Sequence, residues 1–159
     1  MTYWYIYGAG GLGVETMDIL CEMIADIPSL DVTPTFVTDG PKGRPIRGHP
    51  VISFADVEPG SAVTIAVGEP ATRRLLREKA VAAGLELRSV ISPRAFVSEF
   101  AIIGSGGIVA PFCSIQARAR VGENVAINSA AIIGHDVVVE RDCGLSSMIN
   151  IGGATTIGA

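Results

Sequence analysis

The sequence is poor in basic residues and in long apolar runs, and both absences narrow the choice of function. Twelve lysines and arginines against sixteen acidic residues give a net charge of −4, and no basic cluster alternates with aromatic residues. Nucleic acid is therefore not an expected partner. No run approaches 18 consecutive apolar residues and the amino terminus carries no basic leader, so we expect neither a membrane-spanning helix nor a signal peptide.

Cysteine and histidine are also scarce. The three cysteines, Cys21, Cys113 and Cys143, form no CxxC pair, and the two histidines are His49 and His135. The usual metal-ligand spacings and a disulfide framework are thus missing, and we expect no metal cofactor. We expect the cysteines to be reduced thiols of a cytoplasmic protein, with Cys113 and Cys143 in packing roles, and His49 to be an exposed loop residue.

The chain from residue 91 onward repeats with a period of six. Every sixth residue is aliphatic over twelve consecutive steps, and the residue two places before each is mostly small. Neither an α-helix nor an ordinary hairpin sheet keeps such a phase for so long, and the pattern is typical of a β-solenoid. Three hexads make one triangular turn of about 18 residues. Residues 91–159 should therefore form about four coils, with these side chains pointing inward: Ile91, Val97, Ile103, Val109, Ile115, Val121, Ile127, Ile133, Val139, Leu145, Ile151 and Ile157.

The first 90 residues have a different organisation, in which short apolar strands alternate with helices. The pattern predicts helices at residues 14–27 and 71–83, a loop at 40–50, and strands at 3–7, 35–38, 63–67 and 87–91. Such alternation predicts a small parallel α/β sheet. The basic side chains of the second helix are expected on its solvated face: Arg73, Arg74, Arg77 and Lys79.

A glycine-rich segment joins the first predicted strand to the first helix. Gly8, Gly10 and Gly13 fit the pattern G-x-G-x-x-G, which lets the backbone approach a phosphate at a helix N-terminus. Asp39, at the end of the next strand, could accept a hydrogen bond from a ribose or a base. Ninety residues supply only about half of a doubly wound dinucleotide domain, which favours a single nucleotide or a nucleotide sugar over NAD. The alternative is that the glycines merely form a tight turn.

Residues 127–142 are almost wholly apolar or small until His135 and Asp136 appear side by side. The pair follows the inward Ile133 by two and three places, which predicts a position at a coil corner, outside the packed interior. A histidine suits the role of general base near neutral pH. Adjacent side chains on a strand point in opposite directions, so Asp136 can orient His135 only if the corner bends the chain. A solvated surface pair is the alternative.

Together the two halves resemble the bacterial hexapeptide-repeat sugar acetyltransferases, which include sialic acid O-acetyltransferases and nucleotide-linked 4-amino-sugar N-acetyltransferases. The resemblance covers the whole chain and is carried by YIYGAGGLGVE, FVTDG, PIRGHPVIS, IAVGEPATRR, SVISPRAFVS and above all INSAAIIGHD. It implies an α/β Rossmann-like N-terminal domain (residues 1–90) that binds a nucleotide sugar, followed by an all-β left-handed parallel β-helix (residues 91–159). The left-handed winding comes from the resemblance alone, because the usual crossover is right-handed.

The resemblance also implies an activity and a set of site residues. The expected protein is a homotrimeric, acetyl-CoA-dependent acetyltransferase acting on a nucleotide-activated amino sugar, with its active sites between neighbouring copies. His135 would be the general base, with Asp136 supporting it. The residues expected near acetyl-CoA are Asn128, Gly144 and Gly153. Those expected to bind the nucleotide sugar are Gly8, Ala9, Gly10, Gly11, Leu12, Gly13, Asp39 and Gly68. The outward residues expected to pack against other copies are Ala126, Ala130 and Ile132.

The chain departs from the family pattern at several points. Leu12 and Gly144 stand where the family usually has histidine, and Pro70 where it often has asparagine. Family members also continue for several more coils beyond the position of Ala159. We therefore expect a truncated β-helix that binds a nucleotide or nucleotide sugar but binds acetyl-CoA poorly. Its last coil is expected to fray or to associate with the open end of another molecule. Two other functions stay open: O-acetylation of a sialic-acid-type sugar, and a non-catalytic remnant that only binds a nucleotide sugar.

Overall fold

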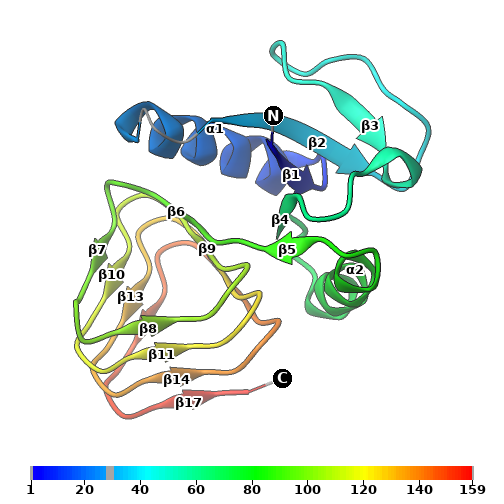
Figure 1. Cartoon of the computed structure of the whole chain (residues 1–159). Coiled ribbons are helices and arrows are strands. Elements are labelled where there is room, and N and C mark those ends of the chain that lie inside the picture. The colour runs from blue at the N-terminus through cyan, green and yellow to red at the C-terminus, as the bar shows by residue number, and fades with distance from the viewer. Residues whose placement is uncertain (1, 28–30, 159) are drawn as a thin grey trace.

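The computed structural model describes residues 2–27 and 31–158, and Figure 1 shows an α/β sheet followed by a stack of triangular coils. Ala159, on which the expectation of a truncated end rests, lies outside the described residues. Within residues 2–27 and 31–158, neither helix has the length and apolar character needed to cross a membrane.

In the described residues of the α/β part, 2–27 and 31–87, the strands form a five-stranded sheet in which every pairing is parallel. In space its strands follow the order β3-β2-β1-β4-β5, so the direction of strand addition reverses between β1 and β4. In parallel sheets of this kind, ligands bind beyond the carboxyl ends of the strands at such a reversal. Along the chain the elements are β1 (Thr2–Tyr7), α1 (Gly11–Asp26), β2 (Val32–Thr38), β3 (Val51–Ser53), a 3₁₀ turn (Phe54–Asp56), β4 (Ala62–Ile65), α2 (Pro70–Ala82) and β5 (Glu86–Leu87).

The elements predicted for this part are confirmed, with shifted ends and two exceptions. The helix α1 begins at Gly11, three residues earlier than predicted, because the glycine segment itself opens the helix. The single strand predicted at residues 87–91 is wrong: β5 ends at Leu87 in the first sheet, and the chain then enters the coils. The edge strand β3 was not predicted, because three residues are too short to show an alternating pattern.

Side-chain alternation along β1 fills a core on each face of the sheet. Trp4 and Ile6 pack with Met17 of α1. Tyr5 and Tyr7 point to the other face, where they pack with Ala80 of α2. The two helices therefore cover opposite faces, and a strand buried on both faces has no polar side, which explains the run YWYIY.

Between residues 90 and 158, the second part consists of twelve two-residue strands in three four-stranded parallel sheets. Each strand pairs with the strand one coil away, as in the register Ile115↔Ile133. The stacked sheets are consistent with the left-handed β-helix that the resemblance implies. The strands are β6 (Val90–Ile91), β7 (Phe96–Val97), β8 (Ile102–Ile103), β9 (Ile108–Val109), β10 (Ser114–Ile115), β11 (Arg120–Val121), β12 (Ala126–Ile127), β13 (Ile132–Ile133), β14 (Val138–Val139), β15 (Gly144–Leu145), β16 (Asn150–Ile151) and β17 (Thr156–Ile157).

The six-residue pattern correctly predicts the interior of the coils. The aliphatic residue of each hexad belongs to one apolar cluster or packs against it, and Ile115, Ile127 and Ile133 are fully buried. The small position two residues earlier is also inward, so Cys113 and Cys143 pack in this core as expected. Stacking of identical positions from coil to coil therefore buries one continuous apolar column.

From Phe112 onward, the corners between the strands turn in the same way. From Phe112 to Ala154, each sixth residue has a positive φ between 56° and 63°, a left-handed conformation that asparagine and aspartate tolerate better than most residues. Asn124, Asp136 and Asp142 are in this series. Glycine is required elsewhere for contact between coils: a Cβ on Gly122 would lie 2.6 Å from the backbone nitrogen of the next coil.

The two parts of the molecule share an apolar interface. Outward side chains of the β6–β9–β12 sheet, Val90, Ile108 and Ala126, pack in the same cluster as α1. Ala126 is 1% exposed. Its predicted contact with a neighbouring copy is therefore wrong, because the protein's own α/β part covers it. Ala130 and Ile132 remain exposed.

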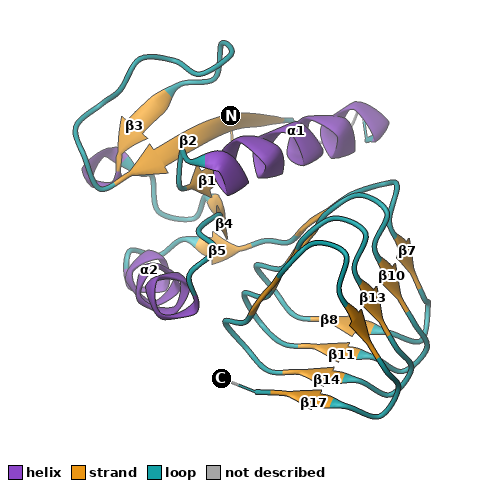
Figure 2. Cartoon of the chain, turned by 180° about the vertical axis from the view of Figure 1, so that it is seen from behind, coloured by secondary structure: helices purple, strands orange, loops and turns teal. Residues whose placement is uncertain are grey.

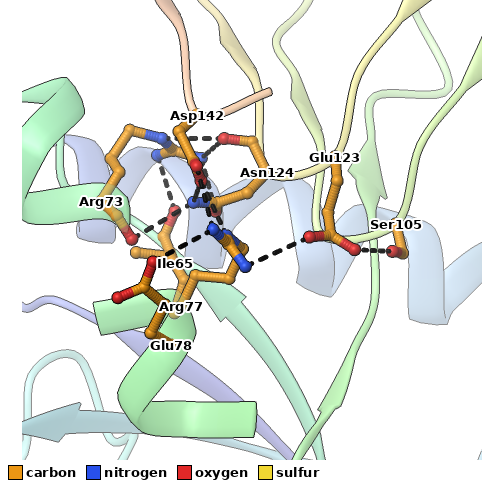
Figure 3. Close-up of polar contacts among 8 residues, drawn as sticks. All are labelled: Ile65, Arg73, Arg77, Glu78, Ser105, Glu123, Asn124 and Asp142. Carbon is orange, nitrogen blue, oxygen red and sulfur yellow. Dashed lines mark hydrogen bonds and ion pairs between the residues drawn. The ribbon is translucent and has the colours of Figure 1, made fainter. Parts of the chain in front are cut away.

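A buried arginine cluster fastens α2 to a coil corner (Figure 3). The guanidinium of Arg73 is fully buried and donates to the carbonyl oxygens of Ile65 and Val67 and to the carbonyl and side-chain oxygens of Asn124, at 2.7–3.0 Å. Burial lowers the pKa of Arg73 to about 10, and the charge of Asp142 offsets part of this effect.

Arg77 lies beside Arg73 in the same cluster. Its guanidinium donates to both carboxylate oxygens of Asp142 at 2.9 and 3.1 Å. Although burial alone would raise the pKa of Asp142, the hydrogen bonds from Arg77 and Asn124 bring it below its usual range. The prediction that these arginines lie on a solvated helix face is wrong for Arg73 and Arg77.

Candidate active site

His135 and Asp136 lie at the corner that joins β13 to β14, as the repeat predicts. Figures 1 and 2 show this corner on the side of the coils away from α1 and α2. The backbone of Asp136 has a φ of 59°, and its N–H donates to the carbonyl of Ala117 in the preceding coil at 3.1 Å. This left-handed turn is the bend that lets two adjacent side chains point toward each other.

The imidazole of His135 is held by hydrogen bonding on one side only. Its Nδ1 lies 2.7 Å from Oδ2 of Asp136. The same carboxylate accepts two hydrogen bonds from Arg118, Nε to Oδ1 and Nη2 to Oδ2, both at 2.7 Å. With a proton on Nδ1, the lone pair of Nε2 is free to accept a proton from a substrate. The arrangement has the chemical form of an oriented general base.

The electrostatics of the corner keep the carboxylate charged. The guanidinium of Arg118, followed in effect by His135, holds the pKa of Asp136 well below its usual range. Asp136 therefore stays ionised far into the acid range and stabilises any positive charge that develops on the imidazole. All three side chains are exposed in a single copy of the chain.

Gly153, from the next coil, lies directly against the imidazole ring. A Cβ on Gly153 would come within 2.6 Å of Nε2 and 2.7 Å of Cε1 of His135. The neighbouring Gly152 has no atom within 4 Å of the corresponding position. The structure thus brings the predicted residues His135, Asp136 and Gly153 together, and the bare backbone of Gly153 leaves the ring its space.

The other residues predicted near acetyl-CoA lie elsewhere on the coils. Asn128 follows β12, and its Nδ2 donates to the carbonyl of Leu145 at 3.0 Å. Gly144 begins β15, on the sheet that faces the α/β part, and a Cβ there would lie 2.6 Å from the carbonyl oxygen of Gly68. Gly144 and Gly68 are therefore neighbours, although they were predicted for different ligands.

The glycine-rich segment between β1 and α1 contains glycines of two kinds. Gly8 has a φ of 124°, and a Cβ on Gly13 would collide with the carbonyl oxygen of Gly8 at 2.1 Å. These two glycines form the tight turn. By contrast, Gly10 and Gly11 have open space where a Cβ would be, and α1 begins there without a side-chain cap. Free backbone N–H groups facing open space at a helix N-terminus suit an anion such as phosphate.

The intervening Ala9 and Leu12 are half-buried against the apolar cluster between the sheet and the coils. They shape the segment by packing and offer a ligand no polar side-chain atom.

Asp39 follows β2 and is already engaged by two side chains. The phenol of Tyr7 donates to its Oδ1 at 2.5 Å, and Lys79 forms an ion pair with the same oxygen. Lys79, followed by Tyr7, lowers the pKa of Asp39. Lys79 also lies over the ring of Phe54, 4.2 Å from its centroid. Oδ2 is the carboxylate oxygen left for a ribose or a base.

Arg118 was not predicted as a site residue, although the repeat contained the signal. Arg118 precedes Asp136 by 18 residues, which is one coil, so the two residues occupy the same corner in successive turns. The prediction that His49 is an exposed loop residue is also wrong. Its ring is half-buried, with Nε2 3.7 Å from Sγ of Cys21 and its edge against Phe36. Within residues 2–27 and 31–158, no three His, Cys, Asp or Glu side chains are grouped to bind a metal.

Known proteins are similar to the chain in both sequence and fold. It is 27% identical over 140 residues to GDP-perosamine N-acetyltransferase of Escherichia coli O157:H7, an alignment that spans 86% of this chain and 63% of that relative. The chain thus spans less than two thirds of that relative's length. No family model matches the chain.

Two solved structures extend the comparison to the fold. PerB from Caulobacter crescentus, in complex with CoA and GDP-perosamine, superposes with a TM-score of 0.82 over the whole of this chain and 84% of its own, at 23% identity. The acetyltransferase domain of PglB from Neisseria gonorrhoeae FA1090, in complex with acetyl coenzyme A, gives a TM-score of 0.78 over 99% and 88%, at 26% identity. These findings confirm the resemblance to the bacterial hexapeptide-repeat sugar acetyltransferases.

Proposed function

We propose that the protein is an acetyltransferase that transfers the acetyl group of acetyl-CoA to the amine of a nucleotide-activated sugar. The observation that carries the proposal is the corner in which Asp136 fixes Nδ1 of His135 and leaves Nε2 free. The named relatives support the substrate class, since one is a GDP-perosamine N-acetyltransferase and others bind CoA with GDP-perosamine or acetyl-CoA.

We further propose that residues 1–90 form a Rossmann-like unit for the nucleotide and residues 91–159 a left-handed β-helix that supplies the catalytic base. The open N-terminus of α1 at Gly10 and Gly11 suits the diphosphate, and Asp39 suits the ribose or the base. The cytoplasmic location expected from the reduced cysteines stays a prediction.

In the proposed reaction, the uncharged amine of the sugar attacks the thioester carbonyl directly. As the new C–N bond forms, Nε2 of His135 accepts a proton from the nitrogen. The C–S bond then breaks, and the imidazolium returns the proton to the departing CoA sulfur. Asp136 stabilises the imidazolium between these two steps. The bare backbone of Gly153 leaves space for the imidazole at this corner.

We propose that the active site is shared between copies in a homotrimer. The glycine-rich segment and the His135 corner lie on opposite sides of one chain, so a sugar held by one copy would meet the histidine of another (Figure 1). Apolar side chains are exposed around the His135 corner, as a contact between copies would require. Phe100, Ile102 and Val138 line a groove with Asp136, and Phe96 and Ile132 lie on the adjoining β7–β10–β13 sheet.

A mixing experiment tests the activity and the sharing together. One variant, His135→Ala, lacks the base, and the other, Gly11→Asp, places a negative charge where phosphate would bind. Gly11 has open space for a side chain, so this variant should fold, and Gly11→Ser is its neutral control. Activity is measured as release of CoA with GDP-perosamine and acetyl-CoA, and the product is weighed by mass spectrometry.

Each variant alone should be nearly inactive, and refolding the two together should restore a measurable part of the activity. Recovery arises because some interfaces of a mixed trimer combine an intact base with an intact glycine segment. Lack of recovery, with wild-type activity present, would contradict a shared site. Acetylation of a hydroxyl rather than an amine would favour the sialic-acid-type alternative, and nucleotide-sugar binding without acetyl transfer would favour the non-catalytic one.

A further inference from the structure

We propose that Arg118 is a positioning residue for catalysis, acting through Asp136 to fix the tautomer and the direction of the His135 ring. The proposal rests on the proposed function, in which His135 is the general base. It goes beyond the His–Asp pair because it assigns a role to a residue in a different coil.

Two features of the backbone bring Arg118 and Asp136 together. Both are corner residues with left-handed backbone, φ 60° and 59°, and they stand one above the other in successive coils. The N–H of Asp136 also bonds to the carbonyl of Ala117, which ties the two corners at the main chain. The arginine therefore approaches the carboxylate from a fixed place and not from a mobile loop.

The contact itself is bidentate. Nε of Arg118 donates to Oδ1 and Nη2 to Oδ2 of Asp136, both at 2.7 Å, so the planar guanidinium fixes the plane of the carboxylate. Oδ2 is also the oxygen that meets Nδ1 of His135 at 2.7 Å. An aspartate held through one oxygen could turn about its side-chain bonds, whereas one held through both presents Oδ2 to the ring in one direction.

The consequence for His135 is a choice of tautomer. An oriented Oδ2 accepts a hydrogen bond from Nδ1–H and so favours the form whose Nε2 carries the lone pair, which is the form a general base needs. Because the Arg118–Asp136 pair is exposed in a single copy, it adds little to stability. Its contribution is geometric, and removing it should leave a folded protein.

The test compares Arg118→Gln with a matched control, Arg120→Gln, in the full chain. Arg120 is exposed, lies two residues away and lines the same groove of about 320 Å³ as Arg118 and Asp136. Arg120→Gln removes the same charge, but Arg120 does not contact the carboxylate of Asp136. Arg118→Lys is the conservative variant, which keeps the charge but cannot donate two parallel hydrogen bonds as the planar guanidinium does. Circular dichroism melting shows whether each variant folds.

Two measurements test the role of Arg118: the tautomer of His135 and the steady-state kinetics. Long-range ¹H–¹⁵N spectra report the tautomer, and His49 serves as an internal reference because the chain has two histidines. In Arg118→Gln the His135 signals should move from the Nδ1–H form toward the Nε2–H form, while His49 does not change. The kcat should fall by about 10-fold, with the KM of each substrate changed less than ~2-fold.

Arg118→Lys should lie between wild type and Arg118→Gln in both measurements, and Arg120→Gln should match wild type. An unchanged His135 tautomer in a folded Arg118→Gln would overturn the proposal, as would an equal loss of kcat in Arg120→Gln. The spectra do not depend on turnover. If Arg118→Gln shows the expected tautomer shift but the wild-type protein transfers no acetyl group, the result counts against the proposed function and not against the role of Arg118.

Discussion

Replacing Arg73 with methionine should destabilise the protein far more than the same change at its exposed neighbour Arg74. Methionine fills much of the space of the buried side chain but offers no N–H donor. Arg73 donates five hydrogen bonds to four acceptor atoms, the carbonyl oxygens of Ile65, Val67 and Asn124 and the Oδ1 of Asn124. All of them lie where α2 meets the coils, so water cannot easily replace the lost donors.

The size of the effect follows from the acceptors. Each buried acceptor that loses its donor costs about 1 kcal/mol, which gives a loss of about 4 kcal/mol in the free energy of unfolding. That is a large share of the ~5–15 kcal/mol by which domains are stable. For a chain of this length it corresponds to a fall in Tm of roughly 8–16 °C.

Thermal and urea unfolding, followed by circular dichroism, measure this loss. Arg74 is exposed on the same helix, so Arg74→Met should change the free energy of unfolding by less than about 0.5 kcal/mol. A difference of less than about 1 kcal/mol between the two variants would contradict the prediction. Such a result would mean that the buried guanidinium contributes no net stability at this interface.

Two further predictions concern the catalytic corner and the carboxyl end of the α/β sheet. Gly153→Ala should displace the His135 ring, because its Cβ would lie 2.6 Å from Nε2, and kcat should fall, whereas Gly152→Ala has open space and should not affect kcat. Steady-state kinetics distinguish the two variants. Burial, followed by Asp39, raises the pKa of Tyr7 to about 12, so the stability linked to this phenol is present below pH ~10 and is lost as the pH rises through 12. Spectrophotometric titration should place its ionisation near 12, and Asp39→Asn should lower that midpoint.

The coils could be predicted from the sequence because their signal is local and repeated. Each hexad has an inward-pointing aliphatic residue at the same position. Ile115 and Ile133 accordingly pair in the register that the period implies. The corner position of His135 and Asp136 follows from the same six-residue period, counted from the inward Ile133. Arg118 was open to the same reasoning, because a residue 18 positions before Asp136 has to lie in the preceding coil at that corner.

The contacts between the two halves could not be predicted in this way. Arg73 lies in a polar helix, next to residues that are exposed. No residue near it in the sequence indicates that its side chain is buried against another part of the chain. Its acceptor Asn124 lies 51 residues away in the repeat, where the sequence pattern does not distinguish it from the other polar corner residues. For the same reason Ala126 gave no sign that the chain's own α/β part covers it. Such contacts depend on how two separately patterned units pack, which neither pattern encodes alone.

The central claim, that His135 is the general base of an acetyl transfer, is tested most directly by the turnover of His135→Ala. Release of CoA should be followed with acetyl-CoA and GDP-perosamine, and His49→Ala is the control for loss of a histidine. If His135 is the general base, kcat should fall by about 10²–10⁴-fold in His135→Ala with little change in nucleotide-sugar affinity, and His49→Ala should retain near wild-type turnover. Near wild-type release of CoA by a folded His135→Ala would show that this histidine is not the general base.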